Sequence, residues 1–245
     1  ALDEVLLGTP SFGIYRNDIM GMGNRFHEVP LTADFTYPLQ EMTARIGPRT
    51  KLVVICSPNN PTGTMVAADA VARFMSQIPE DVIVVFDEAY LEYVRDAHFP
   101  DSLQYVTQGR NAIVLRTFSK IYGLAGLRIG YGLTTPEITT CLNRVRPPFN
   151  ANTLAQQAAL AALGDDEHVA KSRAINAAGM EQLEKGFRDL QLAWIPSSGN
   201  FIAFELPKKN GASTAGAVYQ SLLKKGVIVR PVASYQMPDH LRVTI

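Results

Sequence analysis

The chain has 245 residues, 47% of them hydrophobic, which is enough to bury a core in one large domain or in one large and one small domain. Its 23 Lys and Arg residues balance its 23 Asp and Glu residues, and its densest basic stretches, 144–146 and 224–225, are short. This neutral balance argues against a nucleic acid as partner. Cys56 and Cys141 lie far apart in the sequence, as expected in a reducing cytoplasm.

We expect no targeting signal in this sequence. No apolar run approaches the roughly 18 residues that span a bilayer, and "ALDEVLLGTPSFG" has neither the basic start nor the long apolar centre of a signal peptide. We therefore expect no membrane anchor. The chain opens without Met on a strand-like "EVLLGTP" and stops at "LRVTI", so we expect it to be a piece of a longer protein.

The first half alternates short apolar runs with an amphipathic stretch. The β-branched runs 51–58, 82–89 and 112–119 are typical of strands buried on both faces of a parallel sheet. Between the first two, "AADAVARFMSQIP" places Val71, Phe74 and Met75 at helical spacing. This alternation predicts βαβ units and a mostly parallel α/β sheet. "GLRIGYGLT" predicts one more strand, within 126–134.

Beyond residue 150 the composition changes. The Ala-, Leu- and charge-rich stretch 153–190 predicts two helices broken near Gly164, the second of them long. The remaining segments predict a strand, a helix and two further strands, in "NFIAFEL", "AGAVYQSLLKK", "GVIVRP" and "HLRVTI". They indicate a smaller α+β unit.

These elements predict an α/β fold of two domains. We expect a three-layer sandwich with a mostly parallel sheet over residues 1–165, incomplete at its N-terminus. We expect a bridging helix and a small α+β domain over residues 166–245, incomplete at its C-terminus.

Polar residues follow two of the predicted buried strands. Asn60 stands in "SPNNPTG", Asp87 ends the strand in "VVFDEAY", and Tyr90 comes shortly after it. Ligands of open α/β sheets gather at the carboxyl ends of strands. An ordinary turn, a structural ion pair and core packing are the bland alternatives for these three residues. An unpaired carboxylate is costly at such a place, so we expect a cationic group to face Asp87.

Lys120 follows the third strand in "VLRTFSKIYGLAGLRIGYG", among small residues that permit a close approach of a ligand. A desolvated lysine amine is a nucleophile that forms a Schiff base with an aldehyde. Thr117, Ser119 and Arg128 offer hydroxyls and a guanidinium fork for a phosphate. Each of these residues by itself has a structural explanation.

Together the residues match the chemical groups of pyridoxal 5'-phosphate. Lys120 can react with its aldehyde, and the two hydroxyls and the arginine can bind its phosphate. Asp87 can bind its ring nitrogen, and Asn60 and Tyr90 can bind its phenolic oxygen. Once displaced by the substrate amine, the lysine is free to act as general base and acid.

In order and spacing these motifs resemble the fold-type I pyridoxal-phosphate aminotransferases, and within them the histidinol-phosphate aminotransferases. The resemblance implies the same role for each residue just named. It also implies that Phe12 of "TPSFGIY" stacks on the cofactor ring, with Tyr15 as the alternative. The family's residue at this position is usually Tyr.

The tail "GVIVRPVASYQMPDHLRVTI" is similar to the end of the same family. The resemblance implies that Arg242 holds the anionic end of the substrate, although an exposed strand charge is an alternative, and that Asn200 of "SSGNF" lines the same pocket. It implies a cytoplasmic homodimer that transfers an amino group between L-histidinol phosphate and 2-oxoglutarate, giving imidazole-acetol phosphate and glutamate in histidine biosynthesis.

Other functions stay open at this point. An aromatic amino-acid aminotransferase shares every cofactor residue, and a pyridoxal-phosphate decarboxylase or a pyridoxal-phosphate-binding regulatory module has the same fold. A Rossmann dehydrogenase is disfavoured because no GxGxxG follows the first strand. No metal site is expected, because the four histidines are scattered.

Overall fold

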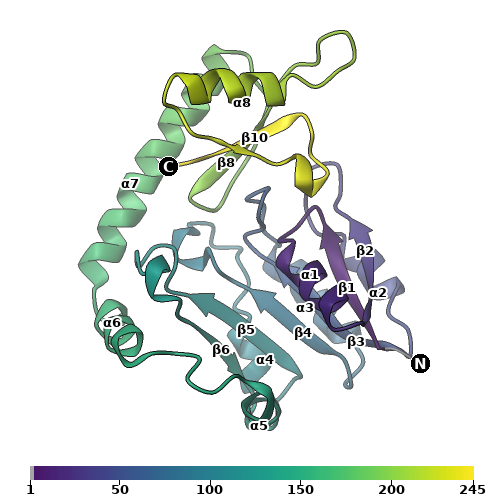
Figure 1. Cartoon of the computed structure of the whole chain (residues 1–245). Helices are drawn as coiled ribbons and strands as arrows, with labels where there is room; N and C mark the ends of the chain where they lie inside the picture. The colour runs from purple at the N-terminus through teal and green to yellow at the C-terminus, as the bar shows by residue number, and fades with distance from the viewer. Residues whose placement is uncertain (1–2) are drawn as a thin grey trace.

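The computed structural model, which describes residues 3–245, contains two β-sheets connected by a long helix (Figure 1). The larger sheet has the strand order β2-β1-β3-β4-β5-β6, and the smaller one has the order β7-β8-β10-β9. The strands are β1 Glu4–Thr9, β2 Arg25–Pro30, β3 Thr50–Cys56, β4 Ile83–Asp87, β5 Ala112–Thr117, β6 Gly130–Thr134, β7 Trp194–Ile195, β8 Phe201–Glu205, β9 Arg230–Pro231 and β10 His240–Thr244.

Helices pack on the larger sheet, and α7 and α8 lie beside the smaller one. The α-helices are α1 Ile14–Gly21, α2 Leu39–Ala44, α3 Ala68–Gln77, α4 Leu103–Thr107, α5 Pro136–Val145, α6 Thr153–Leu163, α7 Asp166–Asp189 and α8 Ala215–Lys224. Three short 3-10 helices are η1 Leu91–Tyr93, η2 Ala125–Leu127 and η3 Ala233–Tyr235.

The larger sheet is parallel except at its edge, where β6 runs antiparallel to β5. Its central strands are the predicted apolar runs, paired in register so that Leu52 lies opposite Ile83 and Val84 opposite Ala112. Strands buried on both faces need apolar side chains at every position, which explains the absence of alternation. The predicted α/β class is confirmed.

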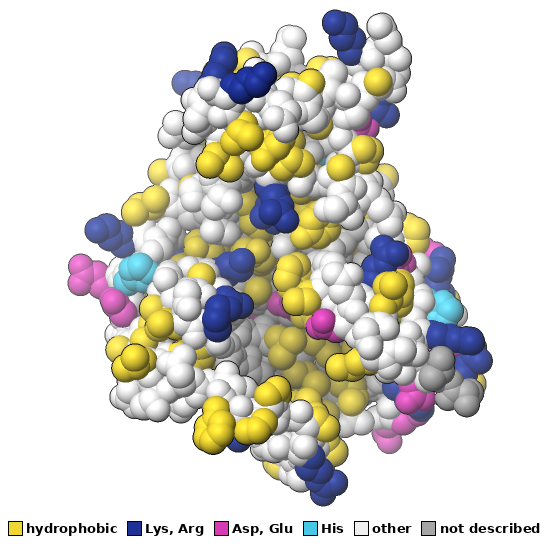
Figure 2. All heavy atoms as spheres, in the orientation of Figure 1, with side chains coloured by type: hydrophobic (Ala, Val, Ile, Leu, Met, Phe, Trp, Pro, Cys, Tyr) yellow, Lys and Arg dark blue, Asp and Glu magenta, His cyan; other side chains and the backbone are white. Residues whose placement is uncertain are grey.

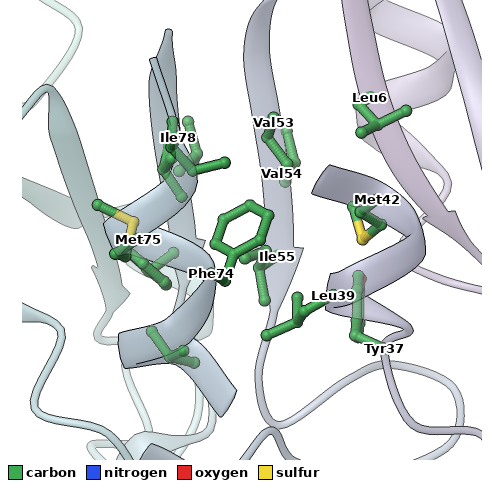
Figure 3. Packing of buried hydrophobic residues seen from close by; sticks show 14 of the residues in the cluster. Leu6, Tyr37, Leu39, Met42, Val53, Val54, Ile55, Phe74, Met75 and Ile78 are labelled. Carbon is green, nitrogen blue, oxygen red and sulfur yellow. The ribbon is translucent and has the colours of Figure 1, made fainter. Parts of the chain in front are cut away.

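The main core lies between this sheet and the helices α2 and α3 (Figure 3). Val71, Phe74 and Met75 of α3 are buried, as their helical spacing predicted. Phe74 points at Ile55 of β3, and burying a side chain of this size contributes about 1.5–3 kcal/mol. The helix α1 lies on the opposite face of the sheet, where its Tyr15 reaches the ends of β3 and β4.

The smaller unit has its own core. The predicted break at Gly164 separates α6 from α7, and the Asp165 side chain caps α7 by accepting a hydrogen bond from the backbone of His168. Buried residues of α7, β8, α8 and β10 pack together, namely Met180, Phe187, Ile202, Phe204, Leu206, Ala215 and Leu241. The domain boundary at residues 165/166 stays a prediction.

One predicted strand is much shorter than expected. In "GVIVRP" only Arg230 and Pro231 pair with β10, and Ile228 is exposed. Gly226, with φ +78°, ends α8 in a left-handed turn, which glycine adopts without steric cost, so the next residues form a connection. Within residues 3–245, no helix combines the length and the apolar composition needed to cross a membrane.

Candidate functional site

A cavity of about 370 Å³ opens at the carboxyl ends of β3, β4 and β5. Parallel strands end on the same edge of a sheet, so the loops that follow them meet there. Cys56, the last residue of β3, pairs with Asp87, the last residue of β4, which in turn pairs with Leu115 of β5. All the residues predicted to bind the cofactor line this cavity, namely Phe12, Asn60, Asp87, Tyr90, Thr117, Ser119, Lys120 and Arg128.

Asp87 is held by two hydrogen bonds. Its Oδ2 accepts one from the hydroxyl of Tyr15 at 2.6 Å, and its Oδ1 accepts one from the backbone amide of Ala89 at 3.1 Å. Burial raises the pKa of the Asp87 carboxyl above its ordinary value, and these two hydrogen bonds, together with the charge of Lys120, offset part of this rise. A cation in the cavity would therefore stabilise the ionised form of Asp87.

The expectation that a cationic group faces Asp87 stays a prediction, because the group proposed for that role is the ring nitrogen of the cofactor. No Lys, Arg or His of residues 3–245 lies within ion-pair distance of this carboxylate. The phenol of Tyr15 donates a hydrogen bond to it. Tyr15, the alternative stacking residue, is thus engaged at Asp87, while Phe12 stands edge-on to it, with ring centroids 6.1 Å apart.

Lys120 projects from the loop after β5 into the cavity. Its Nζ lies 4.8 Å from the ring centroid of Tyr90, whose ring packs edge-on against Phe201 at 5.1 Å. The loop turns back at once, because the amide of Gly123, which has φ +69°, donates to the Lys120 carbonyl at 2.9 Å. The lysine therefore stands on a tight turn beside an aromatic wall.

Three polar groups line one part of the cavity. The Ser119 amide donates to the Thr117 hydroxyl at 3.1 Å, which brings both hydroxyl-bearing residues together. Arg128 adopts a left-handed conformation with φ +52°, and its Nη1 donates to the carbonyl of Ala125 at 2.7 Å. A non-glycine residue in this conformation is uncommon and is often found at functional sites.

The smaller sheet reaches the cavity through Arg242. Its Nη1 donates a hydrogen bond to Oδ1 of Asn60, and its guanidinium lies 4.7 Å from the ring centroid of Phe201. Arg242 itself lines a neighbouring hollow together with Arg230. Arg242 is partly buried and contacts both Asn60 and Phe201, so it is not the exposed strand charge of the alternative interpretation. The carbonyl of Asn200 accepts a hydrogen bond from the Ile245 amide at 3.1 Å, and the place of its side chain in the substrate pocket stays a prediction.

A buried ion pair beside the cavity escaped the sequence prediction. Nη2 of Arg116 lies 3.0 Å from Oε2 of Glu88, whose residue is only 2% exposed. Burial raises the pKa of the Glu88 carboxyl, and Arg116 offsets part of that rise. The only available signal was the position of both residues, each adjacent in sequence to a predicted site residue.

The charged groups of the cavity favour a ligand that carries an anionic group and a cationic ring. Figure 2 shows Lys and Arg side chains, in dark blue, around a hollow between the two sheets, with hydrophobic side chains within it. The amine of Lys120 suits an aldehyde, Arg128 with Thr117 and Ser119 suits a phosphate, and Asp87 lacks the cation that a protonated ring nitrogen supplies. The donor set thus fits the predicted cofactor.

Comparisons with known proteins agree with this chemistry. The model of the family described as aminotransferase class I and II matches residues 1–245. The chain is 50% identical over 235 residues to histidinol-phosphate aminotransferase 2 of Pseudomonas fluorescens (strain Pf0-1), covering 96% of this chain and 62% of that protein. It is 49% identical over 244 residues to the histidinol-phosphate aminotransferase of Moorella thermoacetica, covering 99% of this chain and 62% of that protein.

A solved relative has the same fold. The crystal structure of the histidinol-phosphate aminotransferase from Sinorhizobium meliloti in complex with pyridoxal-5'-phosphate matches with a TM-score of 0.89 at 30% identity, covering 100% of this chain and 66% of that one. The chain spans 62% of the length of the two curated relatives described above.

Proposed function

We propose that this chain, which belongs to the aminotransferase class I and II family, forms the cofactor-binding part of a pyridoxal-phosphate-dependent aminotransferase acting on L-histidinol phosphate and 2-oxoglutarate. The products are imidazole-acetol phosphate and glutamate. The observation that carries the proposal is the convergence of Lys120, Asp87, Asn60 and Arg128 on one cavity that the guanidinium of Arg242 adjoins. The names of the curated relatives support the choice of substrate.

When bound, pyridoxal phosphate supplies an electron-withdrawing ring that stabilises the negative charge left on the substrate carbon after proton removal. Lys120 would hold the aldehyde of the cofactor, and its Nζ, when free, would move the proton. Asp87 would hold the ring nitrogen in its protonated form, because its carboxylate has no other cation within ion-pair distance in the described part of the chain.

The remaining residues hold and orient the cofactor and the substrate. Following the family resemblance, we assign the phenolic oxygen to Asn60 and Tyr90, the phosphate to Thr117, Ser119 and Arg128, and the ring face to Phe12. The proposal is supported by the fact that all six residues line the same cavity. We assign the anionic end of the substrate to Arg242, with Asn200 beside it. A guanidinium fork binds either a carboxylate or a phosphate, so one arginine serves both substrates in turn.

The assembly and location of the protein belong to the same proposal. We infer a homodimer in the cytoplasm, as the resemblance implies. Large apolar side chains are exposed along α5, α6 and the segment between them, which supports an interface there, namely Leu142, Val145, Phe149, Leu154, Leu160 and Leu163.

The test uses the full-length protein and its Lys120→Ala variant. We expect an absorption band with pyridoxal phosphate that borohydride abolishes and that the variant never forms. We expect the native protein to convert histidinol phosphate with 2-oxoglutarate faster than it converts phenylalanine. A band with the opposite substrate preference would favour an aromatic amino-acid aminotransferase, and release of carbon dioxide would favour a decarboxylase. The absence of a band would contradict the cofactor assignment.

A further inference from the structure

The phenol of Tyr15 makes the shortest contact to the Asp87 carboxylate. Tyr15 stands in the first turn of α1, 72 positions before Asp87 in the sequence, and its hydroxyl donates to Oδ2 at 2.6 Å. A hydrogen bond of this length to an ionised acceptor belongs to the stronger, charge-assisted class. The roles proposed above leave this contact unexplained.

The surroundings keep Tyr15 in one protonation state. Its ring packs against the main core, and the thiol Sγ of Cys56 lies 4.0 Å from the same carboxylate oxygen. Burial, followed by the charge of Asp87, raises the pKa of the Tyr15 phenol well above its ordinary value. The phenol therefore stays protonated, and it acts as a donor to Asp87 throughout the working pH range.

Each of the two carboxylate oxygens of Asp87 accepts a hydrogen bond. Oδ1 accepts from the Ala89 amide at 3.1 Å, and Oδ2 accepts from Tyr15. The Ala89 amide belongs to the same chain segment as Asp87, whereas Tyr15 comes from a helix on the face of the sheet. Tyr15 thus gives the carboxylate its short hydrogen bond from a distant part of the chain, beside the weaker contact of the Cys56 thiol.

We propose that Tyr15 is a positioning residue, whose hydroxyl fixes the Asp87 carboxylate with its free acceptor sites toward the cavity. This inference rests on the proposed function, because in that function the oriented carboxylate binds the ring nitrogen of the cofactor. Tyr15 does not touch the reacting atoms and acts only through Asp87. Removing the hydroxyl leaves the carboxylate with the Ala89 amide and the weak thiol contact of Cys56, and makes its protonated form easier to reach.

The first experiment measures Asp87 without any cofactor. The carboxyl carbon of Asp87 is titrated by ¹³C NMR in the cofactor-free full-length protein and in its Tyr15→Phe variant. We expect a higher Asp87 pKa in the variant, because a donor that stabilises the charged form has been lost. Equal Asp87 pKa values in the two proteins would overturn the inference, whether or not the protein binds pyridoxal phosphate.

A matched control is Tyr37→Phe. Tyr37 is another buried tyrosine, and its hydroxyl contacts Ser11 at 2.8 Å and the amide of Cys56 at 3.2 Å, but not Asp87. We expect this variant to leave the pKa of Asp87 where it is in the native protein. An equal rise in both variants would mean that any lost phenol loosens the site, which also overturns the specific role of Tyr15.

An isosteric replacement covers the case in which Tyr15→Phe fails to fold. Incorporation of 3-fluorotyrosine at position 15 keeps the ring and makes its hydroxyl a stronger donor. We expect the pKa of Asp87 to fall below the native value, the opposite sign to Tyr15→Phe. An unchanged or raised Asp87 pKa would contradict the inference.

The second experiment follows the cofactor. Removing a hydrogen bond to a charged group corresponds to about a ten- to hundredfold loss, and we expect Tyr15→Phe to weaken pyridoxal-phosphate binding by that factor, measured by absorption titration. The Tyr37→Phe control should bind as the native protein does. If the native protein binds and Tyr15→Phe binds equally well, the inference fails while the proposed function stands. If the native protein does not bind, the proposed function fails, and the NMR titration alone decides the role of Tyr15.

Discussion

The two sheets deliver their side chains to the site in different ways. The larger, parallel sheet brings Asn60, Asp87 and Lys120 together at the carboxyl ends of neighbouring strands, in loops that its topology places side by side. The smaller, antiparallel sheet contributes Arg242 from the middle of β10, where pairing with Ala203 and Arg230 fixes its position. The strand order of the parallel sheet thus brings Asn60, Asp87 and Lys120 together, whereas the pairing register of the antiparallel sheet sets the position of Arg242.

An aromatic path connects these two regions. Lys120 lies over the ring of Tyr90 at 4.8 Å, Tyr90 packs edge-on against Phe201 at 5.1 Å, and the guanidinium of Arg242 lies over the ring of Phe201 at 4.7 Å. Arg242 also donates a hydrogen bond to Asn60, which lies in the loop after β3 of the larger sheet. The proposed cofactor site and the proposed substrate arginine are therefore linked by packing, and mutations can test how far they are separable.

The largest effect is expected at Lys120. Lys120→Ala removes the amine proposed to bind the aldehyde and to move the proton, a contribution of about 10²–10⁴-fold for the proton transfer alone. We expect kcat to fall by at least that factor, with the urea midpoint of unfolding unchanged. Lys185→Ala, at an exposed position of α7, is the control. Native-like activity of the Lys120→Ala variant would contradict the assignment of Lys120 as the lysine that binds the aldehyde.

The next effect concerns stability and the larger sheet. Phe74 is 2% exposed between α3 and β3, so Phe74→Ala should cost about 3–5 kcal/mol of the free energy of unfolding, from lost burial and the cavity it leaves. Urea denaturation measures this change. Ile228→Ala is the control, because that side chain is 79% exposed. A small effect at Phe74 would mean that the larger sheet is not packed as described.

Arg242 separates the two regions functionally. Arg242→Lys keeps the charge but loses the fork and its geometry toward Asn60, so we expect kcat/KM to fall about ten- to hundredfold. Pyridoxal-phosphate affinity, measured by absorption titration, should change little. An equal loss of cofactor affinity would show that the smaller sheet is part of the cofactor site rather than of the substrate site alone.

The smallest effect is a pH dependence in the smaller sheet. Burial lowers the pKa of His240, which is half-buried at the start of β10 and packs edge-on against Phe35. A lowered folded-state pKa means that the unfolded chain binds the proton more readily, so stability is lost as the pH falls below about 6.5. Denaturation at pH 7.5 and 5.5 should show a larger loss for the native protein than for His240→Gln, and identical losses would contradict this.

Much of the fold follows from local patterns. Continuous β-branched runs marked β3, β4 and β5, the spacing of Val71, Phe74 and Met75 marked the buried face of α3, and Gly164 marked the break between α6 and α7. Such features depend on neighbours in the chain, so the sequence carries them directly. The run in "GVIVRP" was misread as a full strand because pairing depends on a partner, and only its last two residues face β10.

The sequence by itself determined which chemical groups the site holds. Lys120, Asp87, Asn60, Tyr90 and Arg128 follow strand ends, and strand ends of a parallel sheet converge whatever the details of packing. Motif order was therefore enough to bring them to one cavity.

Only the tertiary structure decided what holds those groups in place. The Asp87 carboxylate accepts a hydrogen bond from the phenol of Tyr15, 72 positions away in the sequence, and Asn60 accepts one from Arg242, 182 positions away. Contacts of this kind depend on how a helix lies on a sheet and how two sheets meet. These arrangements result from burial and packing over the whole chain, which no local pattern encodes.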